Sequence, residues 1–256
     1  MTSSLEQWQP LQPGPKTCEQ EAALMEQVLY EVKKVVVGQD VFLERILVAL
    51  LASGHLLIEG VPGLAKTLTV NTLSQVVQGR FSRIQFTPDL LPADLMGSRI
   101  YNQKTGDFST VLGPVMANLL LADEINRAPA KVQSALLEVM QEKQVTIAGQ
   151  SHRVPKPFVV MATQNPIETE GTYPLPEAQV DRFMMKVLVD YPTEQEEFTV
   201  VHRMTGPAPS VSAVTDTATL ERIQSHCRQG YVDPALMQYA VSLVSATRHP
   251  ERHGLP

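Results

Sequence analysis

The chain of 256 residues has little cysteine, no excess of basic residues and no long uninterrupted hydrophobic run. Its two cysteines, Cys18 and Cys227, lie far apart, and neither belongs to a C-x-x-C pair. This argues against a disulfide framework or a structural zinc site and favours a reducing compartment. The most apolar stretch, residues 46–58, is too short to cross a bilayer, and the N-terminus lacks the pattern of a signal peptide. These absences predict a cytoplasmic protein that is not inserted in a membrane.

The charge balance argues against a further class of function. The chain has 21 basic and 27 acidic side chains, a formal net charge of −6 and a pI near 5.5. Proteins that bind the nucleic-acid backbone need a basic surface, so the composition disfavours a nucleic-acid partner. Apolar residues, in contrast, make up 43% of the chain, which is enough to bury a sizeable core in one or two domains.

From residue 55 onward, short apolar runs alternate with segments of helical length. The runs read HLLIEG, RIQF, NLLLADE, FVVMATQN and MKVLVD. Runs of this kind suit strands that are buried on both faces, and their alternation with helices predicts an α/β fold with a parallel sheet between helices. Residues 99–111 and 144–154 alternate around turn residues, which predicts two β-hairpins inserted between the core strands.

The chain is expected to divide into a leader, a core and a helical region. Residues 1–16 carry three prolines and little apolar content, which predicts a disordered leader. A capping box beginning at Thr17 predicts the first helix, which opens an α/β core over residues 17–190. Residues 191–256 look all-helical, with a second capping box beginning at Thr193, and are predicted to form a second, smaller domain.

The stretch GVPGLAKT, residues 60–67, nearly matches the phosphate-binding pattern G-x-x-x-x-G-K-[ST]. It follows a predicted strand and precedes a predicted helix, where backbone N–H groups and the helix N-terminus can form an anion site. Lys66 would reach the β- and γ-phosphates of a nucleotide, and the Thr67 hydroxyl would be a Mg²⁺ ligand. The predicted nucleotide-binding residues of this loop are Gly60, Val61, Pro62, Gly63, Leu64, Ala65, Lys66, Thr67 and Leu68.

Ala65 stands where the pattern has its second glycine. Because this position directly precedes the lysine, we expect its backbone to be entering the helix with a negative φ, where alanine fits at least as well as glycine. The sharp bend is expected at Pro62 and Gly63 instead. The alternative is a plain Gly-Pro turn between strand and helix, with Lys66 in solvent.

Polar side chains at the ends of two later strands favour the nucleotide interpretation. Asp123 and Glu124 end the run NLLLADE, which suits Asp123 as a Mg²⁺ ligand and Glu124 as the base that polarises the attacking water. The run FVVMATQN ends in Gln164 and Asn165, whose amides either bind the water or the γ-phosphate or form an ordinary turn. Arg127 either contacts a neighbouring subunit or caps a helix.

Several ordered motifs together resemble the MoxR family of AAA+ ATPases. They are GVPGLAKT, FTPDLLPADLMG, LLLADEINRAPAKVQSALLEVMQE and MATQNPIETEGTYPLPEAQVDRF, with the two hairpins, and the resemblance covers about residues 25–250. It implies an AAA+ αβα core over residues 17–190 that binds ATP or ADP with Mg²⁺, followed by a small helical lid over residues 191–256. In this family the residue before the lysine is commonly alanine.

The resemblance also implies roles for residues outside the loop. Asn165 matches the sensor-1 residue of the family. Arg182, in PEAQVDRF, matches the arginine finger that reaches the γ-phosphate held by the neighbouring subunit. The adenine pocket would be lined by Val36, Val37, Gly38 and Gln39. The hairpins match insertions of this AAA+ branch and are candidate surfaces for work on a partner.

The family sets the functional expectation. The resemblance implies a homo-oligomer, expected to be a hexameric ring, that hydrolyses ATP to remodel a client protein or to assist metallocofactor insertion. The partner it implies carries a von Willebrand factor A-type domain. One departure matters: the lid motif with the sensor-2 arginine, roughly GASPRA, has no match before Pro256, so the lid is expected to be incomplete.

Two other functions stay open. One is a nucleotide-gated adaptor that binds ATP as an assembly signal and hydrolyses it negligibly; the missing sensor-2 motif leaves room for it, whereas Glu124 and Arg182 favour hydrolysis. The other is a DNA-directed member of the same branch, a helicase or a transcription activator. The acidic pI disfavours it, as do the few basic hairpin residues, Lys104 in one hairpin and His152 and Arg153 in the other. The GAFTGA loop of the activators is also absent.

Overall fold

The structure is a computed structural model that describes residues 15–104, 106–166, 171–207 and 209–254. Its α-helices are α1 (Pro15–Val35), α2 (Asp40–Ala52), α3 (Lys66–Val76), α4 (Pro92–Met96), α5 (Ala130–Glu142), α6 (Glu177–Val180), α7 (Glu194–Met204), α8 (Thr217–Cys227) and α9 (Pro234–Arg248). Short 3₁₀ turns are η1 (Ile125–Arg127) and η2 (Pro250–His253). The strands are β1 (Leu56–Glu59), β2 (Phe81–Gln85), β3 (Gly97–Asn102), β4 (Asp107–Leu112), β5 (Leu119–Asp123), β6 (Gln144–Ile147), β7 (Gln150–Arg153), β8 (Val159–Gln164) and β9 (Met185–Leu188). Within the described ranges, every helix is too short or too polar to cross a membrane.

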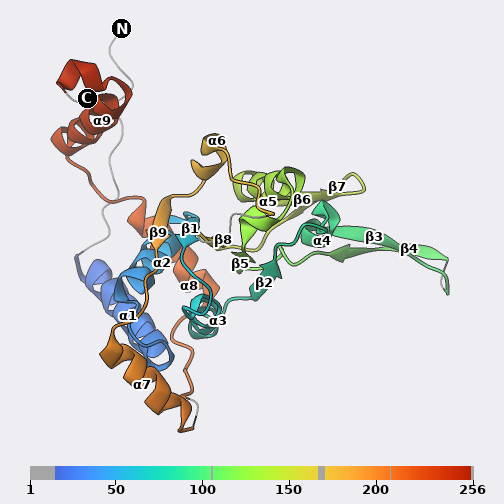
Figure 1. Cartoon of the computed structure of the whole chain (residues 1–256), viewed down its shortest axis with the longest axis horizontal. Coiled ribbons are helices and arrows are strands. Elements are labelled where there is room, and N and C mark those ends of the chain that lie inside the picture. The colour runs from blue at the N-terminus through green and yellow to red at the C-terminus, as the bar shows by residue number, and fades with distance from the viewer. Residues whose placement is uncertain (1–14, 105, 167–170, 208, 255–256) are drawn as a thin grey trace.

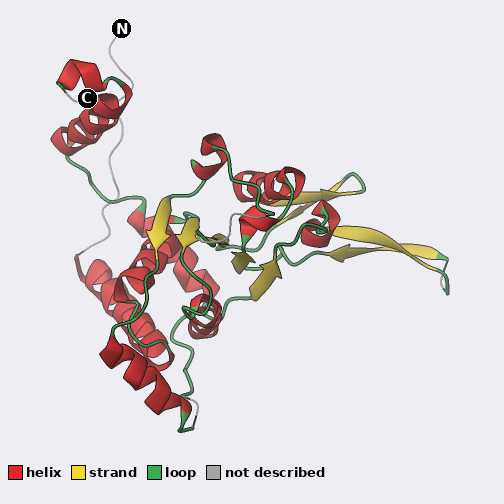
Figure 2. Ribbon diagram, in the orientation of Figure 1, coloured by secondary structure: helices red, strands yellow, loops and turns green. Residues whose placement is uncertain are grey.

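Five strands form one parallel sheet in the order β2-β5-β8-β1-β9 (Figures 1 and 2). The central strands β5 and β8 are buried over almost their whole length. Both faces of such strands meet other side chains, which is why their sequences are continuous apolar runs rather than alternating ones. The structure confirms the predicted α/β fold, with one strand from each of the predicted apolar runs.

Alternate side chains of the strands enter two separate hydrophobic clusters. Leu121 of β5 packs in a cluster with α1, α2 and α3, whereas Leu120 packs on the other face with α4, α5 and the β6-β7 hairpin. The helix α8 joins the first cluster through Leu220 and Ile223, both fully buried or nearly so. The sheet is therefore covered by helices on one face and by helices with a hairpin on the other.

Both predicted hairpins are confirmed. β6 and β7 pair around Ala148 and Gly149, which both have positive φ, as a tight two-residue turn requires. β3 and β4 pair over six residues each and project far from the sheet (Figure 1), with Ile100, Tyr101 and Phe108 exposed. The β3-β4 hairpin therefore exposes apolar side chains that a neighbouring molecule could contact.

The base of the β3-β4 hairpin leaves no space for side chains. A Cβ at Gly97, which has φ 105°, would lie 2.2 Å from the carbonyl oxygen of Val111. A Cβ at Gly113 would lie 2.1 Å from the carbonyl oxygen of Leu95, which belongs to α4 and is fully buried. Gly97 thus lets the two strands meet closely at the hairpin base, and Gly113 lets that base lie directly against the backbone of α4.

Two helix starts test the capping predictions. α7 begins as expected, with the Glu196 carboxylate accepting a hydrogen bond from the Thr193 N–H at 2.8 Å and the Thr193 hydroxyl accepting from the Glu196 N–H. α1 begins at Pro15, so the predicted start at Thr17 is wrong by one half-turn. The last two residues of the predicted leader are therefore helical, and residues 1–14 lie outside the described ranges.

The start of α3 also differs from the prediction. Ala65 precedes the helix with φ 55° and ψ 17°, in the left-handed region, so the expected negative φ is wrong. The bend extends from Gly63, at φ 90°, to Ala65 rather than ending before it. For an L-residue this conformation costs roughly 1–2 kcal/mol, which a glycine avoids.

Replacing Ala65 by glycine should therefore not destabilise the nucleotide-free chain. The relief of left-handed strain offsets the extra entropy of glycine in the unfolded state, so stability should stay equal or rise by up to about 1 kcal/mol. The matched control is Ala23→Gly in the interior of α1, at an exposed helical position, which should cost about 0.5–1 kcal/mol. Denaturant unfolding measures both. Equal losses in the two variants would contradict the left-handed conformation of Ala65.

A buried histidine joins β1 to the neighbouring elements. His55, which directly precedes β1, is 7% exposed. Its Nδ1 accepts a hydrogen bond from the Val160 N–H at 3.0 Å, and its Nε2 faces the Met140 carbonyl oxygen at 3.4 Å. Burial lowers the pKa of His55 from 6.5 to about 4; the contact with Met140 opposes this shift and the charge of Lys143 adds to it. The ring is therefore neutral, with its proton on Nε2.

Acid should destabilise the fold through His55. The unfolded chain takes up this proton near pH 6.5 but the folded chain only near pH 4, so stability falls as the pH drops through that window. The full loss amounts to about 3 kcal/mol. His55→Gln keeps an acceptor for Val160 but does not titrate. Denaturant unfolding of the variant between pH 4 and 6.5 should show a shallower pH dependence than the parent. Parallel curves would contradict the lowered pKa.

Candidate active site

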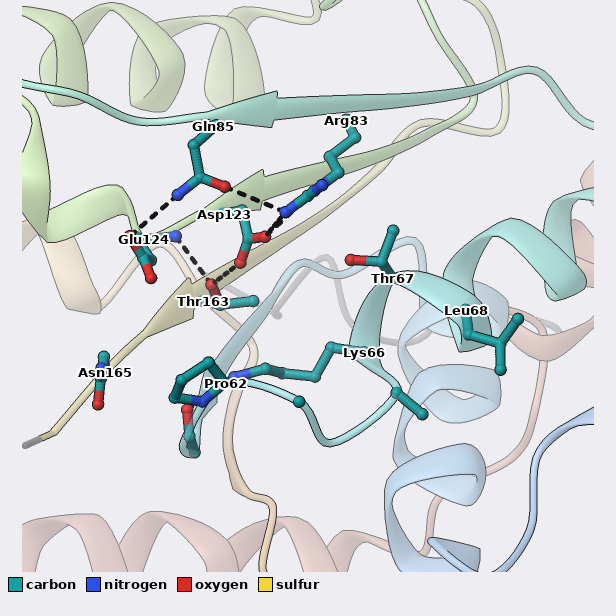
Figure 3. A pocket seen from close by; sticks show the side chains of 13 residues that line it. Pro62, Lys66, Thr67, Leu68, Arg83, Gln85, Asp123, Glu124, Thr163 and Asn165 are labelled. Atoms are coloured by element: carbon teal, nitrogen blue, oxygen red, sulfur yellow. Dashed lines mark hydrogen bonds and ion pairs between the residues drawn. The ribbon is translucent and has the colours of Figure 1, made fainter. Parts of the chain in front are cut away.

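A cavity of about 380 Å³ opens at the carboxyl edge of the sheet (Figure 3). This is the edge at which parallel α/β sheets bind their ligands. Its lining residues are Gly60, Pro62, Gly63, Ala65, Lys66, Thr67, Leu68, Arg83, Gln85, Asp123, Glu124, Thr163 and Asn165. Apart from Arg83, Gln85 and Thr163, each of these is a residue that the sequence predicts for the site.

The loop between β1 and α3 places Lys66 against its own backbone. The Lys66 side chain is 9% exposed, and its Nζ donates a hydrogen bond to the Gly60 carbonyl oxygen at 2.6 Å. Burial lowers the pKa of the Lys66 ammonium, and the charges of Asp123 and Glu124 oppose that shift. The alternative of a solvated lysine in a plain turn therefore does not describe this site.

Asp123 is held from both sides of its strand. Its Oδ1 accepts a hydrogen bond from the Thr163 hydroxyl at 2.6 Å, and its Oδ2 accepts from Arg83 Nη2 at 2.6 Å and from Nε at 3.2 Å. Figure 3 shows the Thr67 hydroxyl turned toward this carboxylate across the cavity. The cavity thus brings together a carboxylate and a hydroxyl that could bind a metal ion, and the Arg83 guanidinium balances the charge of the carboxylate.

Glu124 is fixed through its backbone and its carboxylate. Its N–H donates to the Thr163 hydroxyl at 2.8 Å, and its φ of 55° turns the chain sharply out of β5. Its Oε2 accepts from Gln85 Nε2 at 2.9 Å and lies 2.9 Å from Arg127 Nε. Within its own chain, Arg127 thus pairs with the glutamate that sequence analysis assigns as the base.

Arg83, Gln85 and Thr163 line the cavity without having been predicted from the sequence. Gln85 ends β2 and Thr163 is the next-to-last residue of β8, so the place of these two at the carboxyl edge could have been inferred, whereas Arg83 lies in the middle of β2. That β2 neighbours β5 could not be inferred, because strand order is set by tertiary packing rather than by chain order. The sequence signal that could have identified these residues is the presence of polar side chains within otherwise apolar strands.

Several predicted residues lie outside the cavity. Leu64 is buried in the first cluster, and Val61 packs against that cluster. These two side chains therefore anchor the loop to the hydrophobic core. Asn165, 9% exposed, lines the cavity at the end of β8. Arg182 is exposed and does not line the cavity; its Nη1 donates to the Ala178 carbonyl oxygen at 2.9 Å.

The predicted adenine-pocket residues are not part of this cavity either. Val36 is buried in the first cluster, and Gly38 abuts the Glu196 carboxylate of α7. Gln39 lines a separate cavity of about 330 Å³ together with Asp190, and its Nε2 donates to the Asp190 carbonyl oxygen at 3.0 Å. The remaining predicted residue is Val37, half-buried beside them.

The family match and the similar proteins found for this chain agree with one another. The sequence matches the family described as "ATPase family associated with various cellular activities (AAA)" over residues 55–185, about half of the chain. It is 56% identical over 235 residues to Chaperone MoxR1 of Mycobacterium tuberculosis, and the match covers 92% of this chain but only 62% of that protein. It is 30% identical over 234 residues to Protein MoxR of Paracoccus denitrificans, covering 86% of this chain and 68% of the relative.

A solved structure agrees with these matches. A chain from Cytophaga hutchinsonii, described as a candidate ATPase, superposes with a TM-score of 0.87 at 49% identity, covering 94% of this chain and 74% of the other. Sequence and structure therefore point to one group of proteins: the chain belongs to the MoxR family of AAA ATPases.

Proposed function

We propose that this chain hydrolyses ATP with Mg²⁺ as one subunit of a homo-oligomeric ring and uses the energy to remodel a client protein. The observation that carries the proposal is that Lys66, Asp123 and Glu124 line one cavity, although the loop and the acidic pair lie far apart in the sequence. A phosphate-binding lysine opposite a paired aspartate and glutamate is the arrangement that phosphoryl transfer to water needs.

The residues divide into binding and reacting groups. The loop from Gly60 to Leu68 would bind the phosphates, with Lys66 released from the Gly60 carbonyl oxygen to reach them. Glu124 would take a proton from the attacking water, and Asn165 would orient that water or the γ-phosphate. The exposed Arg182 would serve a neighbouring subunit, which agrees with its place outside the cavity of its own chain.

The donor set fits Mg²⁺. This ion prefers oxygen ligands and takes few of them from the protein when phosphates supply the rest. Thr67 and Asp123 offer a hydroxyl and a carboxylate that face each other across the cavity, and the guanidinium of Arg83 balances the charge of Asp123 until the ion binds. When bound, Mg²⁺ would neutralise charge that develops on the phosphate oxygens.

The remaining elements suggest how nucleotide and client meet. Gln39 and its neighbours would contact adenine beside α7, and the helices from residue 191 onward would form the lid. The exposed apolar side chains of β3 and β4 would contact the client or a partner with a von Willebrand factor A-type domain. A hexameric ring in the cytoplasm is the form we expect. A nucleotide-gated adaptor with negligible turnover is the alternative.

The rate of hydrolysis per chain should depend on protein concentration. If Arg182 completes the site of a neighbour, the rate per chain rises with concentration and then levels off, and Arg182→Ala lowers the plateau about 10³-fold or more while keeping ATP binding. Glu124→Gln, which still binds ATP but lacks the base, is the blank. A flat rate that exceeds the blank would contradict the role of Arg182. ATP binding without any rate above the blank would favour the adaptor.

Arg83 should compete with Mg²⁺ for Asp123. Its guanidinium lies 2.6 Å from Oδ2, and the pair is partly exposed, at 47% and 15% of the two side chains. Arg83→Gln should therefore tighten Mg²⁺ binding to the ATP-loaded chain by about two- to fivefold. Calorimetric titration with Mg²⁺ in the Glu124→Gln background, where ATP is not consumed, measures this. Weaker binding in the variant would mean that Arg83 supports the metal site instead of competing for it.

A further inference from the structure

A second cavity, of about 510 Å³, lies at the amino edge of the sheet. Its wall includes Lys156, Pro157 and Phe158, which directly precede β8, whereas Thr163 and Asn165 of the nucleotide site stand at the other end of that strand. The other walls come from the end of α5, the base of the β6-β7 hairpin and one side of α8. A ligand in this groove, which we name the amino-edge groove, would leave the nucleotide site open.

Basic side chains dominate the amino-edge groove. Four cations face two carboxylates there, a surplus of two positive charges on a chain whose net charge is −6. All four are exposed, and none forms an ion pair with a residue that the structure describes. The cations are Lys143, Arg153, Lys156 and Arg228, and the carboxylates are Glu142 and Glu221. Unpaired basic side chains also occur elsewhere on the described surface, but the gathering of four of them in one groove favours an anionic ligand.

The backbone beneath these cations is fixed. α8, which Arg228 directly follows, is anchored by Gln224, whose buried Nε2 donates to the Leu50 carbonyl oxygen at 2.6 Å. The backbone of Lys156 is held by Asn118, whose Nδ2 donates to the carbonyl oxygen of Lys156 at 2.9 Å. Arg153 pairs in register with Gln144 in the hairpin. A ligand would therefore meet a preformed site and would order little more than side chains.

Three apolar residues form part of the groove floor among mainly polar lining residues. Val154, Pro157 and Phe158 line it and are buried, and Phe158 lies edge-on against the ring of His55. Glu142 and Glu221 at the walls would repel closely spaced phosphates, but they can accept hydrogen bonds from peptide N–H groups. The combination suits carboxylates that alternate with apolar side chains and disfavours a polyphosphate or nucleic-acid strand.

We propose that the amino-edge groove binds an acidic, partly apolar peptide segment of a partner protein. The cations would hold the carboxylates, and the floor would receive the apolar side chains. Because the groove and the nucleotide site lie at opposite edges of one sheet, the partner could stay bound while ATP is exchanged and hydrolysed.

The test uses a labelled synthetic peptide of alternating glutamate and leucine, followed by fluorescence anisotropy with the full chain. Arg153→Gln combined with Lys156→Gln should weaken binding about tenfold, because two partly exposed charge contacts are lost. Glu142→Gln combined with Glu221→Gln should strengthen it, since two repulsive carboxylates are removed. The matched control is Arg45→Gln with Lys131→Gln, which removes two exposed cations outside the groove and should leave the affinity unchanged.

Each contrary result overturns the proposal. No measurable binding by the parent, equal affinity for the glutamine-leucine peptide, or equal losses in the groove and control variants would exclude an acidic-peptide site. Tighter, groove-dependent binding of a single-stranded oligonucleotide would identify a nucleic-acid site instead. A groove variant that changes the sedimenting mass but not the peptide affinity would make the groove a contact between copies of the chain. Far-UV circular dichroism and ATP binding should match the parent in every variant.

Discussion

The parallel pairing of β5 with β2 on one side and β8 on the other is the constraint on which the nucleotide site depends. It sets Gln85 level with Asp123 and brings Thr163 of β8 to the same height. A slip of one residue in either pairing would turn these side chains to the opposite face of the sheet. The apolar runs of the three strands oppose such a slip only in part. Because both faces of these strands are apolar, a shifted strand would still bury apolar side chains on each face. The hydrogen bonds among Asp123, Thr163 and Arg83 complete the register from the carboxyl edge.

The sequence predicted the fold well because its signals are local. Apolar runs, turn residues and capping boxes lie within a few positions of one another, and the strands, both hairpins and the start of α7 followed from them. Strand order depends on contacts between distant segments, so the approach of Arg83 and Gln85 to the acidic pair could not be predicted. Ala65 shows a different limit. Helix propensity describes the average backbone, whereas the tight loop before α3 imposes a left-handed residue irrespective of propensity.

Charge is distributed very differently at the two edges of the sheet. At the carboxyl edge, each acidic side chain of the site is already paired, Asp123 with Arg83 and Glu124 with Gln85 and Arg127. At the amino edge, the cations of the groove form no ion pair with a described residue, and Arg228 donates a hydrogen bond to the neutral Ser53 hydroxyl. At the carboxyl edge, these contacts reduce the repulsion between the two carboxylates before a nucleotide binds. At the amino edge, the positive charges remain available to attract an anionic ligand. The neutral His55 below the groove avoids adding a further buried positive charge.

The close approach of Gly113 to the backbone of α4, and of Gly97 to β4, has a mechanical consequence. A hairpin that is fastened to a short helix at its root cannot pivot there independently, so it moves with that helix as one lever (Figure 1). α4 follows β2, the strand that carries Arg83 and Gln85, by only a short segment. A small rotation at the root is magnified along the arm, and the largest displacement falls on the exposed aromatic residues near the tip, Tyr101 and Phe108.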